Sequence, residues 1–271
     1  LRSTTEIYEG DSMELKQNHV KRVLKKGGTC FGTMLRLVKA PEVISLCATA
    51  GWDYVVLDTE HRDYNSESLK SLSLIAKYEN LSFLVRVPDK LYHQLANTLD
   101  LGAEGLVLPR VDTEEEVRHI IQSTKYFPLG QRGASISNIA TRFRDCSAEQ
   151  FLGWSNSETL IVVQIETEEA VNRVDSIVSV EGVDAVMIGP FDLSQSLGIP
   201  GQLRDPRVAD AFQAVIEACN RHGVAPGVHL TTLEDAKLWT SRGMRFITFQ
   251  YDSQYLLRAF RETVAQLKQF A

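Results

Sequence analysis

Polar side chains that could do chemistry stand at the ends of four short apolar segments. They are Asp58, Glu60 and His61 around the end of "YVVLD", Arg86 in "FLVRV", Gln164 and Glu166 in "LIVVQIE", and Asp192 after "AVMIG". A buried strand disfavours an unpaired carboxylate, because removing the charge from water costs free energy unless a partner compensates for it. We therefore expect a positive charge next to Glu166.

Two of these carboxylates could bind a divalent metal. Glu166 and Asp192 follow neighbouring apolar segments, and Mg²⁺ or Mn²⁺ prefers oxygen ligands, often one or two carboxylates with water or substrate in the other positions. A metal held in this way could polarise a substrate carbonyl, and Arg86 could stabilise the enolate oxygen that develops. We predict a divalent metal, Mg²⁺, Mn²⁺ or Co²⁺, as the cofactor.

His61 is the candidate acid–base group, because the reference pKa of histidine lies close to neutral pH. A neutral imidazole needs a partner that fixes its tautomer, and Asp58 or Asp100 could serve. Taken alone, each candidate has a simpler interpretation: Asp192 as a helix N-cap, His61 as a structural group, Arg86 as an ion-pair partner. Their combination at several strand ends favours a site that makes and protonates an enolate.

The elements that must position these residues alternate along the chain. Eight short apolar segments begin at Cys30, Tyr54, Phe83, Gly105, Leu160, Ala185, Ala225 and Phe246. Helical patterns lie between most of them, with Thr113 as an expected N-cap and Gly223 as an expected C-cap. Eight strands alternating with helices predict an α/β fold, a (β/α)8 TIM barrel, whose strand ends converge on one catalytic rim.

The alternative fold is a doubly wound open sheet, but no G-x-G-x-x-G follows the first segment. We predict a single domain over residues 1–271, with a helical extension at 1–28 and a long loop with a short helix between residues 130 and 157. Within a barrel, a Schiff-base enzyme would need a desolvated interior lysine. None of the eight apolar segments contains lysine, which favours the metal route to an enolate.

Composition excludes several classes of partner. The formal net charge of −6 provides no electrostatic footprint for nucleic acid or an anionic membrane. The 4 cysteines are widely spaced, as is usual for thiols in a reducing compartment. No apolar segment resembles a signal peptide or is long enough to cross a bilayer. We therefore expect a cytoplasmic protein that acts on a small molecule.

Several motifs together resemble the HpcH/HpaI family of metal-dependent 2-oxo-acid aldolases. They are "LDTEH", "LVRVP", "PLGQRG", "VVQIET" and "VEGVDAVMIGPFDLSQSLGIPGQ", and the resemblance extends from about Gly32 to the C-terminal helix. It implies a (β/α)8 barrel, commonly a hexamer built as a trimer of dimers, with the C-terminal helix exchanged between subunits. It also implies reversible cleavage of a 4-hydroxy-2-oxo acid to pyruvate and an aldehyde.

The matching motifs imply a role for each candidate residue. His61 resembles the acid–base residue of the family, and Arg86 resembles the cation that stabilises the enolate. Glu166 and Asp192 resemble the metal ligands, and Asp100 in "LDLGAEG" matches a carboxylate that supports the histidine. The pyruvate carboxylate and keto groups would be held by Gln164, Gly189, Pro190, Phe191 and Asp192.

Departures from the family leave the aldehyde open. Phe191 stands where the best-known members have alanine, which would narrow the pocket, and Met34 replaces a tryptophan common in the first strand. Strand alternation places Arg36 on the same side as Met34. Arg36 could bind a distal carboxylate or be a solvated surface group, and His229 could contact substrate or make a structural hydrogen bond.

Two other functions remain open on these residues. An oxaloacetate decarboxylase, or another lyase of 2-oxo acids or acyl-CoA esters, would use the same metal and Arg86. A non-catalytic binding protein on a barrel scaffold is the third possibility, although all the expected site residues are present. We predict an aldolase whose partners are a small 2-oxo acid and further copies of itself, with neither nucleic acid nor a membrane.

Overall fold

The computed structural model describes residues 15–136, 138–143 and 145–270. Its strands form a closed barrel in which β1 to β8 follow one another in chain order and every adjacent pair is parallel. The strands are β1 (Cys30–Leu35), β2 (Tyr54–Asp58), β3 (Ser82–Arg86), β4 (Gly105–Leu108), β5 (Leu160–Ile165), β6 (Ala185–Ile188), β7 (Gly227–Leu230) and β8 (Phe246–Tyr251). The predicted barrel is confirmed, and the open sheet is excluded.

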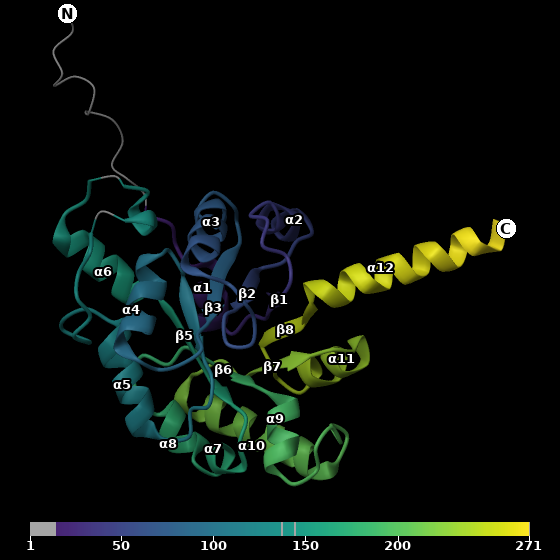
Figure 1. Ribbon diagram of the computed structural model, residues 1–271. Coiled ribbons are helices and arrows are strands. Elements are labelled where there is room, and N and C mark those ends of the chain that lie inside the picture. The colour runs from purple at the N-terminus through teal and green to yellow at the C-terminus, as the bar shows by residue number, and fades with distance from the viewer. Residues whose placement is uncertain (1–14, 137, 144, 271) are drawn as a thin grey trace, which may run out of the picture.

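Helices surround the barrel and alternate with its strands (Figure 1). They are α1 (His19–Lys25), α2 (Val43–Thr49), α3 (Ser66–Ala76), α4 (Tyr92–Asp100), α5 (Glu114–Thr124), α6 (Ala148–Glu158), α7 (Glu168–Asn172), α8 (Val174–Val178), α9 (Pro190–Ser196), α10 (Pro206–His222), α11 (Leu233–Ser241) and α12 (Asp252–Leu267), with 3-10 turns η2 (Ile139–Thr141) and η3 (Lys268–Phe270). Thr113 caps α5 in a capping box with Glu116, and Gly223 ends α10 in the left-handed region, as expected. Among the described residues, no helix combines the length and apolar character that crossing a membrane requires.

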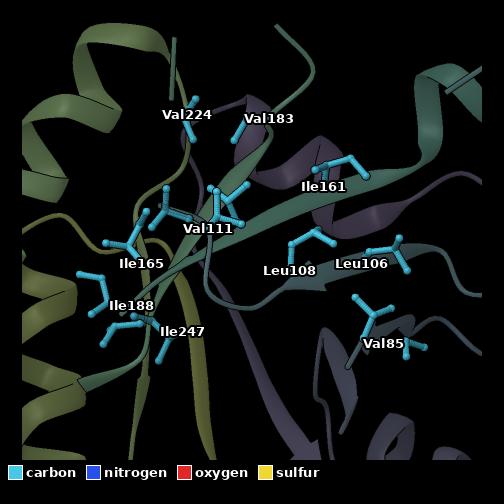
Figure 2. Packing of buried hydrophobic residues seen from close by; sticks show 14 of the residues in the cluster. Val85, Leu106, Leu108, Val111, Ile161, Ile165, Val183, Ile188, Val224 and Ile247 are labelled. Carbon is cyan, nitrogen blue, oxygen red and sulfur yellow. The ribbon is translucent and has the colours of Figure 1, made fainter. Parts of the chain in front are cut away.

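Two apolar layers follow from the strand period of two. Alternate residues such as Val85, Leu106 and Ile161 point outward and pack under the helices (Figure 2). The residues between them, including Leu84 and Val162, point inward and fill the barrel. Because both faces of each strand are covered, the strands are apolar almost throughout, as parallel strands usually are.

Aromatic stacking fills the interior at the N-terminal ends of the strands. The rings of Tyr54 and Phe246 are 4.4 Å apart and nearly parallel. A side chain on Gly32 would collide with Tyr54, since a Cβ there would lie 2.3 Å from its ring. Val20 and Leu24 of α1 pack against the same inward cluster. This end of the barrel is therefore solid, and the open end lies where the strands finish.

Two predictions about the terminal segments remain untested. The expected helical extension at 1–28 lies partly outside the described residues, and within them it forms α1. At the other end, α12 projects away from the barrel (Figure 1), so that most of its side chains have no cover within the chain. The exchange of this helix between subunits stays a prediction.

Candidate active site

A cavity of about 740 Å³ opens at the C-terminal rim of the barrel. Its walls include Met34, Arg86, Gln164, Gly189, Asp192 and His229. Four of these six residues, at positions 34, 86, 164 and 229, come from the alternate strands β1, β3, β5 and β7, as an inward layer of a barrel requires. The C-terminal ends of these four strands therefore meet at one cavity.

Arg86 is held in a fixed orientation by two buried carboxylates. Its Nε and Nη2 lie 3.1 and 2.8 Å from the two oxygens of Asp58, and its Nη1 lies 3.2 Å from Glu60. Burial by itself would lower the pKa of Arg86, but Asp58 and Glu60 outweigh that effect and raise it. Burial would likewise raise the pKa of Asp58, but Arg86 lowers it. Arg86 therefore presents a permanent positive charge at the cavity.

Glu166 lies buried at the end of β5 in surroundings that disfavour its charge. Its Oε1 accepts a hydrogen bond of 2.7 Å from the backbone N–H of Arg110, and Oε2 accepts one from the Gln164 amide. Burial, with the nearby negative charges of Asp192 and Glu60, raises the pKa of Glu166 to about 7. No lysine or arginine within the described ranges forms an ion pair with it. The expected counter-charge is thus not a side chain of this part of the chain.

These surroundings fit a divalent cation. The buried carboxylate of Glu166 and the exposed carboxylate of Asp192 repel each other, and a metal between them would offset this repulsion. The Oε1 atom of Gln164 is a further buried oxygen without a hydrogen-bond donor. A Cβ at Gly189 would lie 2.9 Å from Oε2 of Glu166, so only glycine leaves that space open. In the described residues no three His, Cys, Asp or Glu side chains surround one metal position. Two protein ligands would therefore be completed by water or substrate.

The remaining predicted pyruvate-binding residues follow β6. Gly189 precedes α9, whose first residue is Pro190, and Asp192 lies in the first helical turn. The Phe191 side chain is 59% exposed, yet it also lines the cavity. The whole predicted segment from Gly189 to Asp192 therefore faces the same space as Arg86 and Gln164.

His61 and its two expected partners do not contact one another through the imidazole ring. His61 is exposed on the loop after β2, with Nε2 3.6 Å from Oε2 of Glu60. Asp58 accepts the backbone N–H of His61 at 3.2 Å, while Asp100 forms a 2.5 Å ion pair with Arg132 at the end of α4. Within one chain these carboxylates have other partners, and their support of the His61 tautomer stays a prediction.

Arg36 is placed differently from either expectation. It is neither a solvated surface group nor part of the cavity wall: its Nε lies 3.1 Å from Asp58 and its guanidinium is 4.4 Å from the centre of the Tyr251 ring. Two arginines thus share one buried aspartate. The sequence indicated the side to which the Arg36 side chain points, because alternation along β1 places it with Met34, but it did not indicate Asp58 as its partner.

Arg110 is a site residue that the sequence analysis did not identify. It follows β4 with a left-handed backbone (φ 51°), its N–H donates to Glu166, and its guanidinium reaches 3.6 Å from Glu60. Its position directly after an apolar segment was the available signal. Left-handed non-glycine residues often occur at functional sites, where the surrounding structure maintains the strain.

Comparison with known proteins gives a consistent result. The model of the family described as HpcH/HpaI aldolase/citrate lyase matches residues 34–259. A 4-hydroxy-2-oxovalerate aldolase from Rhodococcus jostii is 33% identical over 96% of this chain and 99% of its own length. A 2-keto-3-deoxy-L-rhamnonate aldolase from Salmonella typhimurium is 31% identical over 94% of each chain. The crystal structure of an HpcH/HpaI aldolase from Desulfitobacterium hafniense is 36% identical and superposes with a TM-score of 0.88, covering 92% of this chain and 96% of that one.

Proposed function

The chain belongs to the HpcH/HpaI aldolase/citrate lyase family, and from this premise we propose that it is a metal-dependent aldolase. It reversibly cleaves a 4-hydroxy-2-oxo acid to pyruvate and an aldehyde. The observation that carries this proposal is one cavity lined by a fixed cation, Arg86, and by Asp192, with the buried carboxylate of Glu166 behind the lining residue Gly189 and repelled by Asp192. The names of the relatives from Rhodococcus and Salmonella support the same reaction class.

Glu166 and Asp192 would hold the divalent ion, Mg²⁺, Mn²⁺ or Co²⁺. When bound, such an ion polarises the 2-oxo group and offsets the negative charge of the enolate. Of the protein groups, Arg86 donates hydrogen bonds to the oxygen on which that charge develops. Because Asp58 and Glu60 already orient the guanidinium, little reorganisation is needed in the transition state.

The other groups orient the substrate and move its proton. Gln164 and the segment from Gly189 to Asp192 hold the carboxylate and keto groups of pyruvate. His61 takes the proton of the 4-hydroxyl as the carbon–carbon bond breaks, with Asp58 and Asp100 in supporting roles. His61 lies on the rim loop and contacts Glu60, which itself contacts Arg86. Through this connection the acid–base group and the enolate cation belong to one charged network.

The assembly and location form part of the proposal. We infer a homo-hexamer, a trimer of dimers, in which α12 is exchanged; the exposed apolar residues Leu257, Phe260 and Val264 lie on one face of that helix. We also place the protein in the cytoplasm. Its thiols are free and three of them are buried, which suits a reducing compartment.

Decarboxylation of oxaloacetate is the second candidate function. It produces the same enolate by loss of CO₂ and needs no base for a hydroxyl proton. The observation in its favour is that His61 is exposed and outside the residues that line the cavity. Replacing His61 with alanine distinguishes the two reactions, because it should impair aldol cleavage much more than decarboxylation.

The direct test is exchange of the methyl protons of pyruvate in D₂O, followed by NMR. We expect exchange with Mg²⁺ or Mn²⁺, none after chelation, and recovery when the ion returns. Arg86→Lys should slow exchange roughly 10²–10³-fold, since lysine lacks the planar set of donors. Arg118→Lys is the matched control, because Arg118 is exposed on α5 and pairs with Glu114, and it should change the rate little.

Two results would overturn the proposal. Full exchange after exhaustive chelation would exclude a metal, and a pyruvate adduct trapped by borohydride would indicate a Schiff base instead. An Arg86→Lys enzyme with unchanged rates of both exchange and oxaloacetate decarboxylation would make Arg86 a structural residue only.

A further inference from the structure

The cavity extends beyond the residues assigned to pyruvate. Its far wall is formed by His229 of β7, Thr231 and Thr232 of the following loop, Asp235 of α11, and Gln202 of the loop before α10. Arg86, Gln164 and Asp192 take the pyruvate half on the side of β3, β5 and β6. The atoms of the substrate that become the aldehyde therefore meet the wall near β7 and α11.

His229 is held firmly within this wall. It points inward on β7 opposite Thr248 of β8, and its ring lies 4.7 Å from the ring of Tyr251. The Tyr251 ring in turn carries the guanidinium of Arg36 at 4.4 Å, and Asp58 anchors Arg36 at 3.1 Å. The imidazole therefore presents a defined edge to the cavity.

The imidazole ring of His229 can form further hydrogen bonds. Burial, together with the charges of Arg86 and Arg36, lowers the pKa of His229 to about 4, so at neutral pH the ring is uncharged with one donor and one acceptor nitrogen. Nε2 lies 3.4 Å from the carbonyl oxygen of Gln250, which is long for a hydrogen bond. Within the described residues Nδ1 has no hydrogen-bond partner. A group with a pKa near 4 is a poor base at neutral pH but a good neutral partner for a hydroxyl.

The charges along the far wall disfavour a carboxylate at this position, since the two cations nearest His229, Arg86 and Arg36, are already paired with Asp58. Arg204 lines the cavity, but it is 75% exposed and forms a 3.0 Å ion pair with Glu234. Asp235 adds a negative charge and accepts a hydrogen bond of 2.6 Å from the Thr232 hydroxyl. A distal carboxylate would therefore face Asp235, whereas a hydroxyl would find an imidazole, hydroxyls and an amide.

On the basis of the proposed aldolase function, we propose that His229 is a specificity-determining residue. Its neutral ring forms a hydrogen bond with a hydroxyl on the aldehyde half of the substrate. The enzyme therefore prefers short 2-hydroxyaldehydes to unsubstituted aldehydes of the same length and to aldehydes that carry a carboxylate.

The experiment compares kcat/KM for addition of pyruvate to lactaldehyde and to propanal, which differ by one hydroxyl, with succinic semialdehyde as the carboxylated aldehyde. We expect the wild-type enzyme to favour lactaldehyde over propanal by about tenfold, which is the range of one hydrogen bond to a neutral group. His229→Leu should bring this ratio close to one, and His229→Asn, which keeps a polar group near the position of Nδ1, should restore part of it. His222→Leu makes the same chemical change on the surface of α10 and should leave the ratio unchanged.

The ratio is measured within one preparation, so a general loss of activity does not affect it. A wild-type enzyme that shows no preference for lactaldehyde, or prefers succinic semialdehyde, would overturn the inference even if the variants failed to fold. Retention of the ratio in His229→Leu would overturn it as well. Absence of pyruvate proton exchange in the wild type would instead contradict the aldolase function itself, so the two failures are distinguishable.

Discussion

Two residues at the rim, Glu166 and Arg110, are held in states that cost free energy. Glu166 is a buried carboxyl whose pKa is raised to about 7, and Arg110 adopts a left-handed backbone that costs roughly 1–2 kcal/mol for a residue with a side chain. The two are linked, because the left-handed turn directs the Arg110 N–H at the Glu166 carboxylate. Both costs are understandable at the proposed cation site.

The raised pKa of Glu166 predicts how the metal-free protein responds to pH. Between the ordinary value of 4.5 and about 7, the folded protein holds a proton that the unfolded chain has already released. The contribution of Glu166 to stability is therefore present below pH 4.5 and is lost as the pH rises to about 7, by up to about 3 kcal/mol. Urea unfolding of the chelated protein at pH 5 and pH 7.5 measures this loss.

Glu166→Gln provides the control, because the amide cannot titrate. The wild-type protein should lose more stability than this variant between the two pH values, and added Mg²⁺ should remove the difference by binding the ionised carboxylate. Identical pH dependence in both proteins would show that Glu166 has an ordinary pKa.

At the scale of elements, the junction between β8 and α12 controls the end of β1. Asp252, the first residue of α12, accepts the backbone N–H groups of Arg36, Leu37 and Val38 at 3.0, 3.0 and 2.8 Å. Arg36 then reaches Asp58, the partner of Arg86. The junction at the end of β8 thus helps to position Arg86 through the segment that follows β1.

Asp252→Ala would leave four backbone N–H groups, those of Arg36, Leu37, Val38 and Ser253, without this acceptor. We expect it to lower the free energy of unfolding by about 2–4 kcal/mol, since the lost hydrogen bonds involve a charged and largely buried acceptor. Asp210→Ala, an exposed change on α10, is the control and should alter stability by less than about 0.5 kcal/mol. Equal unfolding midpoints in urea would show that water replaces the carboxylate at no cost.

At the scale of the whole molecule, helix α12 has an apolar face that the rest of the described chain does not cover. Leu257, Phe260, Val264 and Leu267 are between 40% and 63% exposed and recur at helical spacing along one face. An apolar face of this length on a projecting helix is typical of a subunit interface. The proposed hexamer would cover it.

Phe260→Asp should therefore shift the molar mass measured by light scattering from an oligomer toward a monomer, because burying an aspartate in an apolar interface is costly. Ala265→Asp adds the same charge on the opposite face of α12 and should leave the mass unchanged. A wild-type protein that is monomeric at micromolar concentration would contradict the proposed assembly.

The order of the strands and the location of the site could be predicted from the sequence because they depend on local patterns. Apolar segments marked the strands, and their polar ends, from Asp58 to Asp192, meet at the rim of any parallel barrel. The segment from 130 to 157 was less predictable. It includes all but the last residue of the 11-residue helix α6, of which only Phe151 and Ser155 are buried, so the apolar period of this helix is weak.

Only the tertiary structure decided which residues the charged side chains at the rim contact. Arg36 and Asp252 are 216 residues apart, and closure of β8 against β1 brings them together. The same closure places Arg36 on Asp58 and Tyr251, whereas the end of α4 places Asp100 beside Arg132. A sequence pattern determines which side chains point inward at the rim. It does not determine which of several charged neighbours each one meets, because that depends on the distances that barrel closure sets.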